Sequence, residues 1–306
     1  MTPPSRAGRT TSGPALAVDV RTLHRIEDLA VAEALFAATW PGQPPASAAL
    51  LRAIEHAGGY VAGAYRCSDD ESGTASEMVG AAAGFLAAHP GPALHSHVAA
   101  VTPAARGMGV GHAIKNHQRA WAAEHRLAAV TWTFDPLVRR NAWFNIAKLG
   151  AGVEEYLVDF YGPMDDGIND GDASDRLLAV WHTPPPSTRD HAIPADHAIR
   201  VDHVTTPSRD RHGLHDHEQG ARDDTRMRGA VAALDEVGGR PAVRETPDRA
   251  PLVAVATPPD VETLRRTDPA LARRWRVAVR EQLAPRLSTG RVVGFTRGGS
   301  YLVAPG

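Results

Sequence analysis

The chain has 306 residues, 43% of them hydrophobic, which is enough for about two domain-sized units. Its 33 Lys and Arg residues nearly balance 35 Asp and Glu residues, so no basic excess favours a nucleic-acid or anionic-membrane partner. The single cysteine, Cys67, excludes an intramolecular disulfide and a thiolate-rich zinc site, and it favours a reducing, cytoplasmic location. No apolar run approaches the ~20 residues of a membrane helix.

The first part of the chain alternates strand and helix patterns after a polar, Pro-rich tail at residues 1–14, which does not resemble a signal peptide. We predict strands at 16–23, 60–65, 78–87, 94–101, 128–132, 153–161 and 176–181, and helices at 26–39, 46–57, 109–125 and 141–149. In the helix at 109–125, Ile114 and Trp121 mark the side that packs on the sheet, and Lys115 and Arg119 take the other side. The fold class is therefore α/β, with a mixed central sheet flanked by helices.

The rest of the chain divides into two further parts. Residues 183–250 are rich in Pro, Asp, Arg, Gly and His, and we expect a polar, flexible insert there. Order returns in 251–306, where the pattern predicts a strand at 252–256, one or two helices over 261–287, and strands at 291–296 and 301–303. This C-terminal α/β extension is expected to add to the sheet of residues 15–182 or to pack beside it.

A glycine-rich turn from Val101 to Gly111 separates the strand at 94–101 from the helix at 109–125. It lacks the Gly-Lys-Ser/Thr ending of a Walker loop, and its glycines do not fit G-x-G-x-x-G. What it offers is a set of unobstructed backbone amides at a helix N-terminus, which suits a pyrophosphate. Taken alone, such a cluster is more often an ordinary strand-to-helix turn.

Arg106-x-x-Gly109-x-Gly111 resembles the acyl-CoA-binding signature of the GNAT (Gcn5-related N-acetyltransferase) superfamily, and Asn141, followed nine residues later by Gly150, resembles the next helix of that fold. Other segments are similar to a bacterial group of predicted GNAT acetyltransferases with a C-terminal extension: 95–97, 132–137, 140–142, 160–162, 174–176, 275–276 and 293–295. The resemblance covers about residues 15–182 and 251–303. It implies a GNAT-like fold with an acyl-CoA co-substrate, and we expect no metal.

The resemblance also implies where that co-substrate binds. It assigns the pyrophosphate to the backbone of Arg106, Gly107, Met108, Gly109, Val110 and Gly111. It assigns the pantetheine to the strand edge at Ala99 to Val101, and it puts Asn141 near the pantetheine or the thioester. The Arg106 side chain could contact a phosphate, or it could be an ordinary surface arginine.

Acyl transfer to an amine needs a general base, and His95 and His97 are the candidates because imidazole titrates near neutral pH. Strand alternation predicts that both lie on the face that carries Ala99 and Val101. The resemblance adds that His95 stands where GNAT histone acetyltransferases have a glutamate base. Either histidine could instead merely bond a neighbouring loop or backbone group.

The sequence departs from the family at Ile146, where many GNAT enzymes carry a tyrosine that protonates the leaving thiolate. Tyr161, at the end of the next predicted strand, is our candidate to replace it. The alternatives are that the thiolate leaves unprotonated, or that the protein binds CoA without catalysis. Tyr161 could also be an ordinary aromatic residue at a strand end.

Structural roles are the leading interpretation of the remaining candidates. Cys67 has no base nearby in sequence, and His212, His215 and His217 lie in the polar insert without a second ligand cluster. Several polar residues could bind an amino-acid-like acceptor or could cap helices and turns: Asp135, Arg140, Asn169, Ser174, Asp175 and Arg176.

The sequence predicts a cytoplasmic, acyl-CoA-dependent N-acyltransferase that transfers an acyl group, with acetyl-CoA as first candidate, directly to a small amine. A homodimer is one candidate assembly. The alternative is a non-catalytic CoA-binding or regulatory GNAT-like protein, motivated by Ile146. A third hypothesis is an interaction module that works through the charged insert at 184–250.

Overall fold

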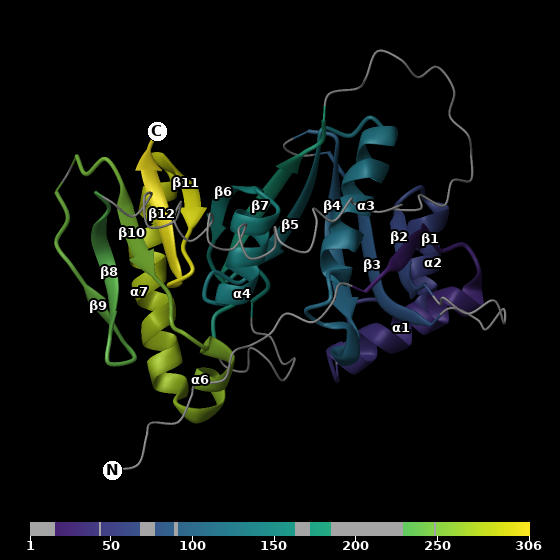
Figure 1. The fold of residues 1–306 in the computed structure, drawn as a ribbon, viewed down its shortest axis with the longest axis horizontal. Helices are drawn as coiled ribbons and strands as arrows, with labels where there is room; N and C mark the ends of the chain where they lie inside the picture. The colour runs from purple at the N-terminus through teal and green to yellow at the C-terminus, as the bar shows by residue number, and fades with distance from the viewer. Residues whose placement is uncertain are drawn as a thin grey trace, which may run out of the picture.

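The computed structural model describes residues 16–42, 44–67, 77–88, 91–162, 172–184, 229–247 and 249–306. Within them the chain forms two sheets that lie side by side (Figure 1). The first has seven strands in the order β1-β2-β3-β4-β5-β7-β6, and the second has five in the order β11-β12-β10-β8-β9.

The seven-stranded sheet contains β1 (Val18–Thr22), β2 (Tyr60–Arg66), β3 (Met78–Ala87), β4 (Ala93–Val101), β5 (Ala129–Phe134), β6 (Gly152–Leu157) and β7 (Arg176–His182). Neighbouring strands are antiparallel except for β4 and β5, which run parallel. A parallel pair needs a crossover connection, and a helix supplies it here. The sheet is therefore mixed, as the sequence predicts.

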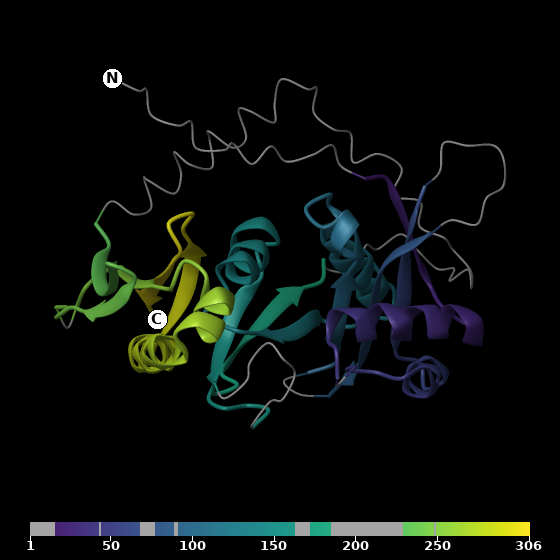
Figure 2. The ribbon, with the colours of Figure 1, turned by 90° about the horizontal axis from the view of Figure 1, so that it is seen from below.

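Helices cover both faces of this sheet (Figure 2). One face carries α1 (Ile26–Thr39) and α2 (Ala48–His56), and the other carries α3 (Val110–Glu124), α4 (Arg139–Ala142) and the π-helical turn η2 (Trp143–Lys148). A short turn, η1 (Pro103–Ala105), links β4 to α3. Leu29 and Phe36 of α1 pack on one side of the sheet, and Ile114 of α3 packs on the other. The predicted fold class, a mixed sheet flanked by helices, is confirmed.

The C-terminal sheet contains β8 (Val231–Val237), β9 (Arg240–Val243), β10 (Val253–Ala256), β11 (Gly290–Phe295) and β12 (Ser300–Pro305). The long helix α7 (Pro269–Leu287) packs against its strands, and α6 (Val261–Thr267) packs against α7. The two helices begin after the capping residues Asp260 and Asp268. Trp275 of α7 is fully buried, and its Nε1 donates a hydrogen bond to the carbonyl of Gly239 at 3.0 Å. The extension therefore forms a sheet of its own.

The expectation of a flexible insert is wrong for residues 231–243, which form the hairpin of β8 and β9. The short apolar run from Val231 to Leu234 pairs in parallel with β10, which the polar composition around it conceals. Gly238 and Gly239 both have positive φ, at 57° and 78°, as a two-residue hairpin turn requires. Residues 185–228 lie outside the described residues.

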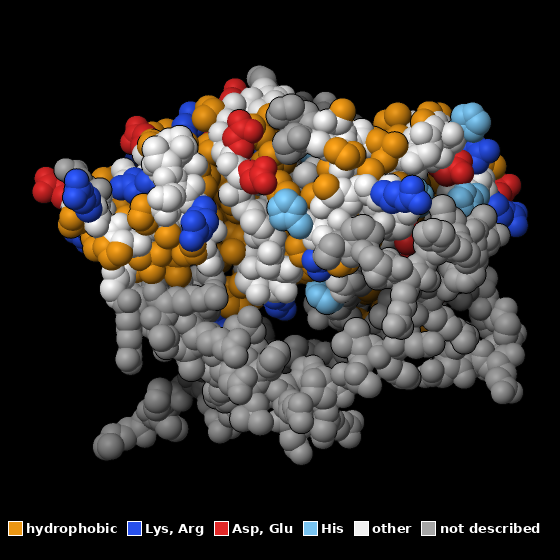
Figure 3. Space-filling model, turned by 90° about the horizontal axis from the view of Figure 1, so that it is seen from above, with side chains coloured by type: hydrophobic (Ala, Val, Ile, Leu, Met, Phe, Trp, Pro, Cys, Tyr) orange, Lys and Arg blue, Asp and Glu red, His pale blue; other side chains and the backbone are white. Residues whose placement is uncertain are grey.

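On the face seen in Figure 3, acidic and basic side chains of the described residues are interspersed, without one continuous basic patch. Among the residues that the structure places, no helix has the length and apolar character needed to cross a bilayer.

Candidate functional site

The main opening in the seven-stranded sheet is a fork between β4 and β5. The two strands pair at only three positions, ending at His95 and Thr131. Beyond that pair β4 continues to Val101 and β5 to Phe134, and the two strands no longer pair with each other. One backbone edge of the β4 arm therefore lacks a strand partner and can bind an extended ligand.

The glycine-rich turn lies at the open end of this fork, where β4 leads through η1 into α3. Gly109 caps α3 with φ at +88°, and no described side chain hydrogen-bonds to the first-turn amides. A Cβ at Gly107 or Gly109 would meet nothing within 4 Å, and one at Gly111 would meet only the Phe144 ring, at 3.9 Å. The turn thus presents backbone amides to open space, which suits an anion at the helix N-terminus.

Arg106 is exposed beside this turn, and its Nε lies 3.4 Å from the carbonyl oxygen of Val101. Met108 is held from the other side, because its carbonyl accepts a hydrogen bond from the Leu16 amide at 3.0 Å. The Arg106 side chain is therefore positioned at the fork mouth without an ion-pair partner among the described residues, which leaves its predicted phosphate contact a prediction.

His97 occupies a β-bulge in β4. Ala83 of β3 pairs with Val98 and the next residue, Gly84, pairs with Ser96, so His97 is the extra residue on its strand. Bulges increase twist and interrupt the alternation of side chains, and this one coincides with the start of the fork.

The bulge overturns one prediction about the histidines. In β3, Ala82 pairs with Ala99 and Phe85 pairs with His95. Ala82 and Phe85 are three residues apart, so they face opposite sides of the sheet, and so do their partners Ala99 and His95. Val101 packs against the core cluster that includes α3, so it and Ala99 lie on the α3 face. His95 lies on the α1 face, so the prediction that it shares a face with Ala99 and Val101 is wrong.

His95 is half-buried at the last paired position of the fork. Its Nδ1 lies 3.1 Å from the Thr131 hydroxyl oxygen, and its Nε2 has no partner among the described residues. Burial lowers the pKa of His95, and the nearby His97 and Lys115 lower it further. The ring is therefore neutral at pH 7 with one nitrogen available to accept a proton. His97 is exposed, with its ring 5.8 Å from that of Phe85.

Tyr161 lies on the same face of the fork as His95. Its hydroxyl is 3.0 Å from that of Thr133, which stands two residues beyond Thr131 on β5. The structure thus brings His95 and Tyr161 to the α1 side of one β5 segment, about 7 Å apart along the strand. Tyr161 is 44% exposed, and the Arg176 guanidinium lies 5.3 Å from its ring centroid.

Asn141 and Ile146 lie in the helical segment that follows β5. The Asn141 side chain is partly buried in α4 and has no hydrogen-bond partner among the described residues. Ile146 lies in the π-helical turn η2 and packs against the core. An aliphatic side chain at this position supplies no proton, so the leaving group needs another acid if the site is catalytic.

Sequence reasoning missed one residue of the fork. We expect Lys115 on the solvent side of α3, but it is only 7% exposed. Its Nζ donates a hydrogen bond to the Ser96 hydroxyl at 2.9 Å and lies 3.9 Å from the centroid of the Trp132 ring. The expectation fails because α3 is buried over a broader arc than one amphipathic stripe, as fully buried Gln118 also shows.

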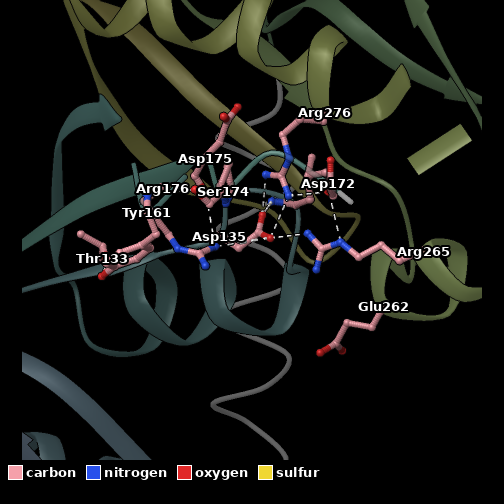
Figure 4. A network of polar contacts seen from close by, with 12 residues as sticks. Thr133, Asp135, Tyr161, Asp172, Ser174, Asp175, Arg176, Glu262, Arg265 and Arg276 are labelled. Atoms are coloured by element: carbon pink, nitrogen blue, oxygen red, sulfur yellow. Dashed lines mark hydrogen bonds and ion pairs between the residues drawn. The ribbon is translucent and has the colours of Figure 1, made fainter. Parts of the chain in front are cut away.

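A buried ion-pair cluster lies beyond the end of β5, at the junction with α6 and α7 (Figure 4). Arg276 binds the two carboxylate oxygens of Asp135 at 2.8 and 2.9 Å, and it binds Asp172 at 2.9 Å. Arg265 contacts both carboxylates, and all four side chains are 2–6% exposed. Burial alone would raise the pKa of Asp135, but Arg276, Arg265 and Arg176 hold it well below its usual range.

The neighbouring polar residues also bond to protein groups. Asp175 binds Arg280 at 2.6 and 2.8 Å and accepts a hydrogen bond from Tyr156 at 2.6 Å. Ser174 bonds to Asp159 at 3.2 Å. Five of the six residues considered for acceptor binding thus form contacts with other protein groups: Asp135, Ser174, Asp175 and Arg176 here, and Arg140 with Glu262.

The remaining candidates add little to the site. Arg140 forms an exposed ion pair with Glu262 of α6, and Cys67 is an exposed free thiol. Within the described ranges, no group of three or more His, Cys, Asp or Glu residues could hold a metal. Asn169, His212, His215 and His217 lie outside the described residues.

No protein-family model matches the chain, and no curated protein matches it. The fold is similar to solved structures that each cover 55–57% of this chain. Ribosomal-protein-S5-alanine acetyltransferase from Vibrio fischeri is 15% identical, with 96% of that chain covered and a TM-score of 0.43. Phosphinothricin acetyltransferase from Sinorhizobium meliloti in complex with acetyl-CoA is 14% identical, with 96% of that chain covered and a TM-score of 0.43. A chain of the NatC complex bound to Gag peptide and CoA is 14% identical, with 100% of that chain covered and a TM-score of 0.42. Similarities at this level assign no residue and no activity to this chain.

Proposed function

We propose that the protein is an acyl-CoA-dependent N-acyltransferase of the GNAT type, with acetyl-CoA as the first candidate donor and a small amine as the acceptor. The observation that carries the proposal is the fork between β4 and β5, which opens toward the glycine-rich turn of α3. An unpaired strand edge can bind the amides of a pantetheine chain, while the helix N-terminus beside it binds the pyrophosphate.

The residues of the fork fit such a donor. The Gly107 to Gly111 backbone faces open space, so a diphosphate can approach its amides closely. The β4 edge at Ala99 to Val101 leads from this turn toward His95, in the direction that an extended thiol arm would follow. Asn141 has a side-chain amide without a partner among the described residues, as a donor contact would require.

A bound acyl-CoA supplies an electrophilic thioester carbonyl, and the chain must remove a proton from the attacking amine. His95 is the proposed general base, because its ring is neutral at pH 7 and its Nε2 is unbonded among the described residues. Backbone amides of the bulged β4 segment can stabilise the oxyanion, since the bulge at His97 takes part of the strand out of its regular ladder.

Ile146 favours one alternative, a protein that binds CoA without catalysis. That side chain packs into the core in the turn where a proton donor is expected. In this alternative the fork and the glycine-rich turn bind CoA, and no amine accelerates the release of its thiol.

Calorimetric titration with CoA and acetyl-CoA, followed by thiol release assays with amino acids, peptide N-termini and simple alkyl amines, tests both hypotheses. Binding together with amine-dependent thiol release supports the transferase. Binding without thiol release for any amine supports the alternative, and no binding of either compound rejects both.

Matched variants locate the site. Gly109→Val should weaken CoA binding about 100-fold, because it strains a backbone at positive φ and obstructs the amides. Gly152→Ala in β6, outside the fork, should change CoA binding less than about threefold, because a Cβ there makes only an ordinary contact. His95→Ala should lower kcat about 100-fold, and exposed His97 replaced by Ala should lower it less than about threefold. Equal turnover in wild type and His95→Ala would remove His95 as the base.

A further inference from the structure

Lys115 is one of only two lysines among the 33 Lys and Arg residues of the chain, and it is buried at the base of the fork. Its Nζ lies between β4 and β5, hydrogen-bonded to Ser96 and above the ring of Trp132. Ser96 and Trp132 directly follow His95 and Thr131, the last paired residues. The amine therefore sits at the point where the two strands separate.

Among the described residues, no carboxylate forms an ion pair with the buried Lys115 amine. The one acidic residue of α3, Glu124, is exposed at the far end of the helix, nine residues from Lys115. The other titratable groups of β4, α3 and η2 are bases: His95, His97, His112, His117, Arg119 and Lys148. Burial lowers the pKa of Lys115 to about 7. Such a group exchanges its proton readily near neutral pH, which no arginine can do.

A second polar side chain of α3 is buried without partners. Gln118, one helical turn beyond Lys115, is 0% exposed, and both atoms of its amide lack a hydrogen bond within the described part of the chain. Unpaired buried polar groups are costly and rare, and they indicate a missing water or ligand. The buried face of α3 that carries Lys115 therefore also carries an unsatisfied polar group at Gln118.

We propose that the Lys115 ammonium donates the proton that the CoA sulfur takes up when the acyl group leaves. The proposal rests on the proposed transferase function. As the new C–N bond forms, the C–S bond breaks, the sulfur keeps the electron pair, and the proton moves from Nζ to sulfur. The proton of the amine passes to His95 on the opposite face, and both side chains return to their starting states by exchange with solvent.

The acidities agree with this direction of transfer. An alkyl thiol has a pKa of about 8.5, so a proton donor near 7 gives its proton to the thiolate with a gain of more than tenfold in the equilibrium. The fork then has a base on the α1 face and an acid on the α3 face, with the thioester position between them. Ile146 needs no replacement tyrosine in this arrangement.

The first test uses the wild-type protein labelled with 13C at Cε of lysine, which gives only two signals. Lys148 is exposed and serves as the internal reference. The Lys115 signal should titrate near pH 7, and CoA should shift it and raise its midpoint by about one pH unit, whereas desulfo-CoA should do so less. If the chemical shift and the titration midpoint of Lys115 do not change with CoA, while calorimetry shows that CoA binds, this proposal is overturned and the proposed function is not affected.

The second test measures kinetics of variants. Lys115→Met should lower kcat about 100-fold and change KM for acetyl-CoA less than about threefold, and Lys148→Met should change neither. Lys115→Arg separates proton donation from simple charge, because guanidinium keeps its proton near neutral pH. An Arg variant with full turnover, or a Tyr161→Phe variant that alone loses the alkaline limb of the pH profile, overturns the assignment. Circular dichroism checks that each variant folds.

Discussion

The protein buries ionisable groups in two regions, and only one of these regions pairs them with opposite charges. At the junction of the sheets, Asp135 and Asp172 are each bonded to the guanidinium groups of Arg265 and Arg276. At the base of the fork, Lys115 meets a hydroxyl and an indole ring but no carboxylate among the described residues. The charged side chains of the cluster and the Lys115 amine are all buried, so the two regions differ in whether an opposite charge accompanies the buried one.

Compensation determines what each region can do. The junction cluster keeps its charges fixed, because the pKa of Asp135 is held far below neutrality and arginine does not titrate. In the fork, burial lowers the pKa of Lys115 to about 7 and lowers the pKa of His95 below its usual value, so neither group has a fixed charge over the ordinary pH range. We infer that the first region holds the two sheets together and that the second is suited to moving protons.

Asp135→Ala should have the largest effect on stability. It leaves Arg265 and Arg276 buried with one shared carboxylate, and breaking a buried pair costs about 3–5 kcal/mol. Urea unfolding followed by circular dichroism measures the loss. A decrease in the free energy of unfolding of less than about 1 kcal/mol would show that the buried cluster does not hold the two sheets together.

Lys115→Met should change stability in the opposite direction. The folded pKa near 7 lies below the unfolded value of 10.5, so the folded state disfavours the protonated amine, fully below pH 7 and less as the pH rises toward 10.5. The variant should gain about 2–4 kcal/mol at about pH 6, with the gain vanishing near pH 10. Urea unfolding at both pH values tests this, and a constant loss would contradict the contrast between the two regions.

The pH dependence of kcat should follow the protonation of His95 and Lys115 in the fork, and it should not depend on the ion-pair cluster at the junction. Because the pKa of His95 is lowered from 6.5, the base is lost only in more acidic solution, and because that of Lys115 is about 7, the acid is lost above neutrality. The kcat profile should be bell-shaped and fall about tenfold per pH unit on each side. Lys115→Met should remove the alkaline limb, and its persistence would separate Lys115 from the chemistry.

Glu262→Gln should have the smallest effect. The pair of Glu262 and Arg140 joins α6 to α4 and so also links the two parts of the chain, but the Arg140 side chain is 68% exposed. Such pairs contribute about 0–1 kcal/mol because water and salt screen them. Urea unfolding beside Asp135→Ala provides a matched comparison, and an equal loss in both variants would mean that burial does not distinguish them.

Much of the fold follows from local patterns in the sequence. The predicted helix at 26–39 and strand at 78–87 agree with α1 and β3 at both ends, because apolar spacing and turn residues bound them. The hairpin of β8 and β9 was missed, since its short strands become stable only by pairing with β10, which follows later in the chain.

The candidate site was predictable only in part. The glycine-rich turn and His95 are recognisable from residue types, because their chemistry is local. The face of His95 depends on a bulge, and alternation alone cannot reveal it. The burial of Lys115 depends on how α3 packs against β4 and β5 where these strands diverge. The amphipathic spacing within one helix does not predict that packing.

The bulge at His97 also changes which residues of β4 face each side of the sheet: odd-numbered residues on one side of the bulge share a face with even-numbered residues on the other. Before the bulge even-numbered residues such as Leu94 face α3, and after it odd-numbered residues such as Val101 do so. Deleting His97 would restore regular alternation in β4 and leave His95 opposite Phe85, on the α1 face. An alignment of β4 to a strand without a bulge must therefore place a gap at His97, because without that gap His95 would be superimposed on residues of the opposite face.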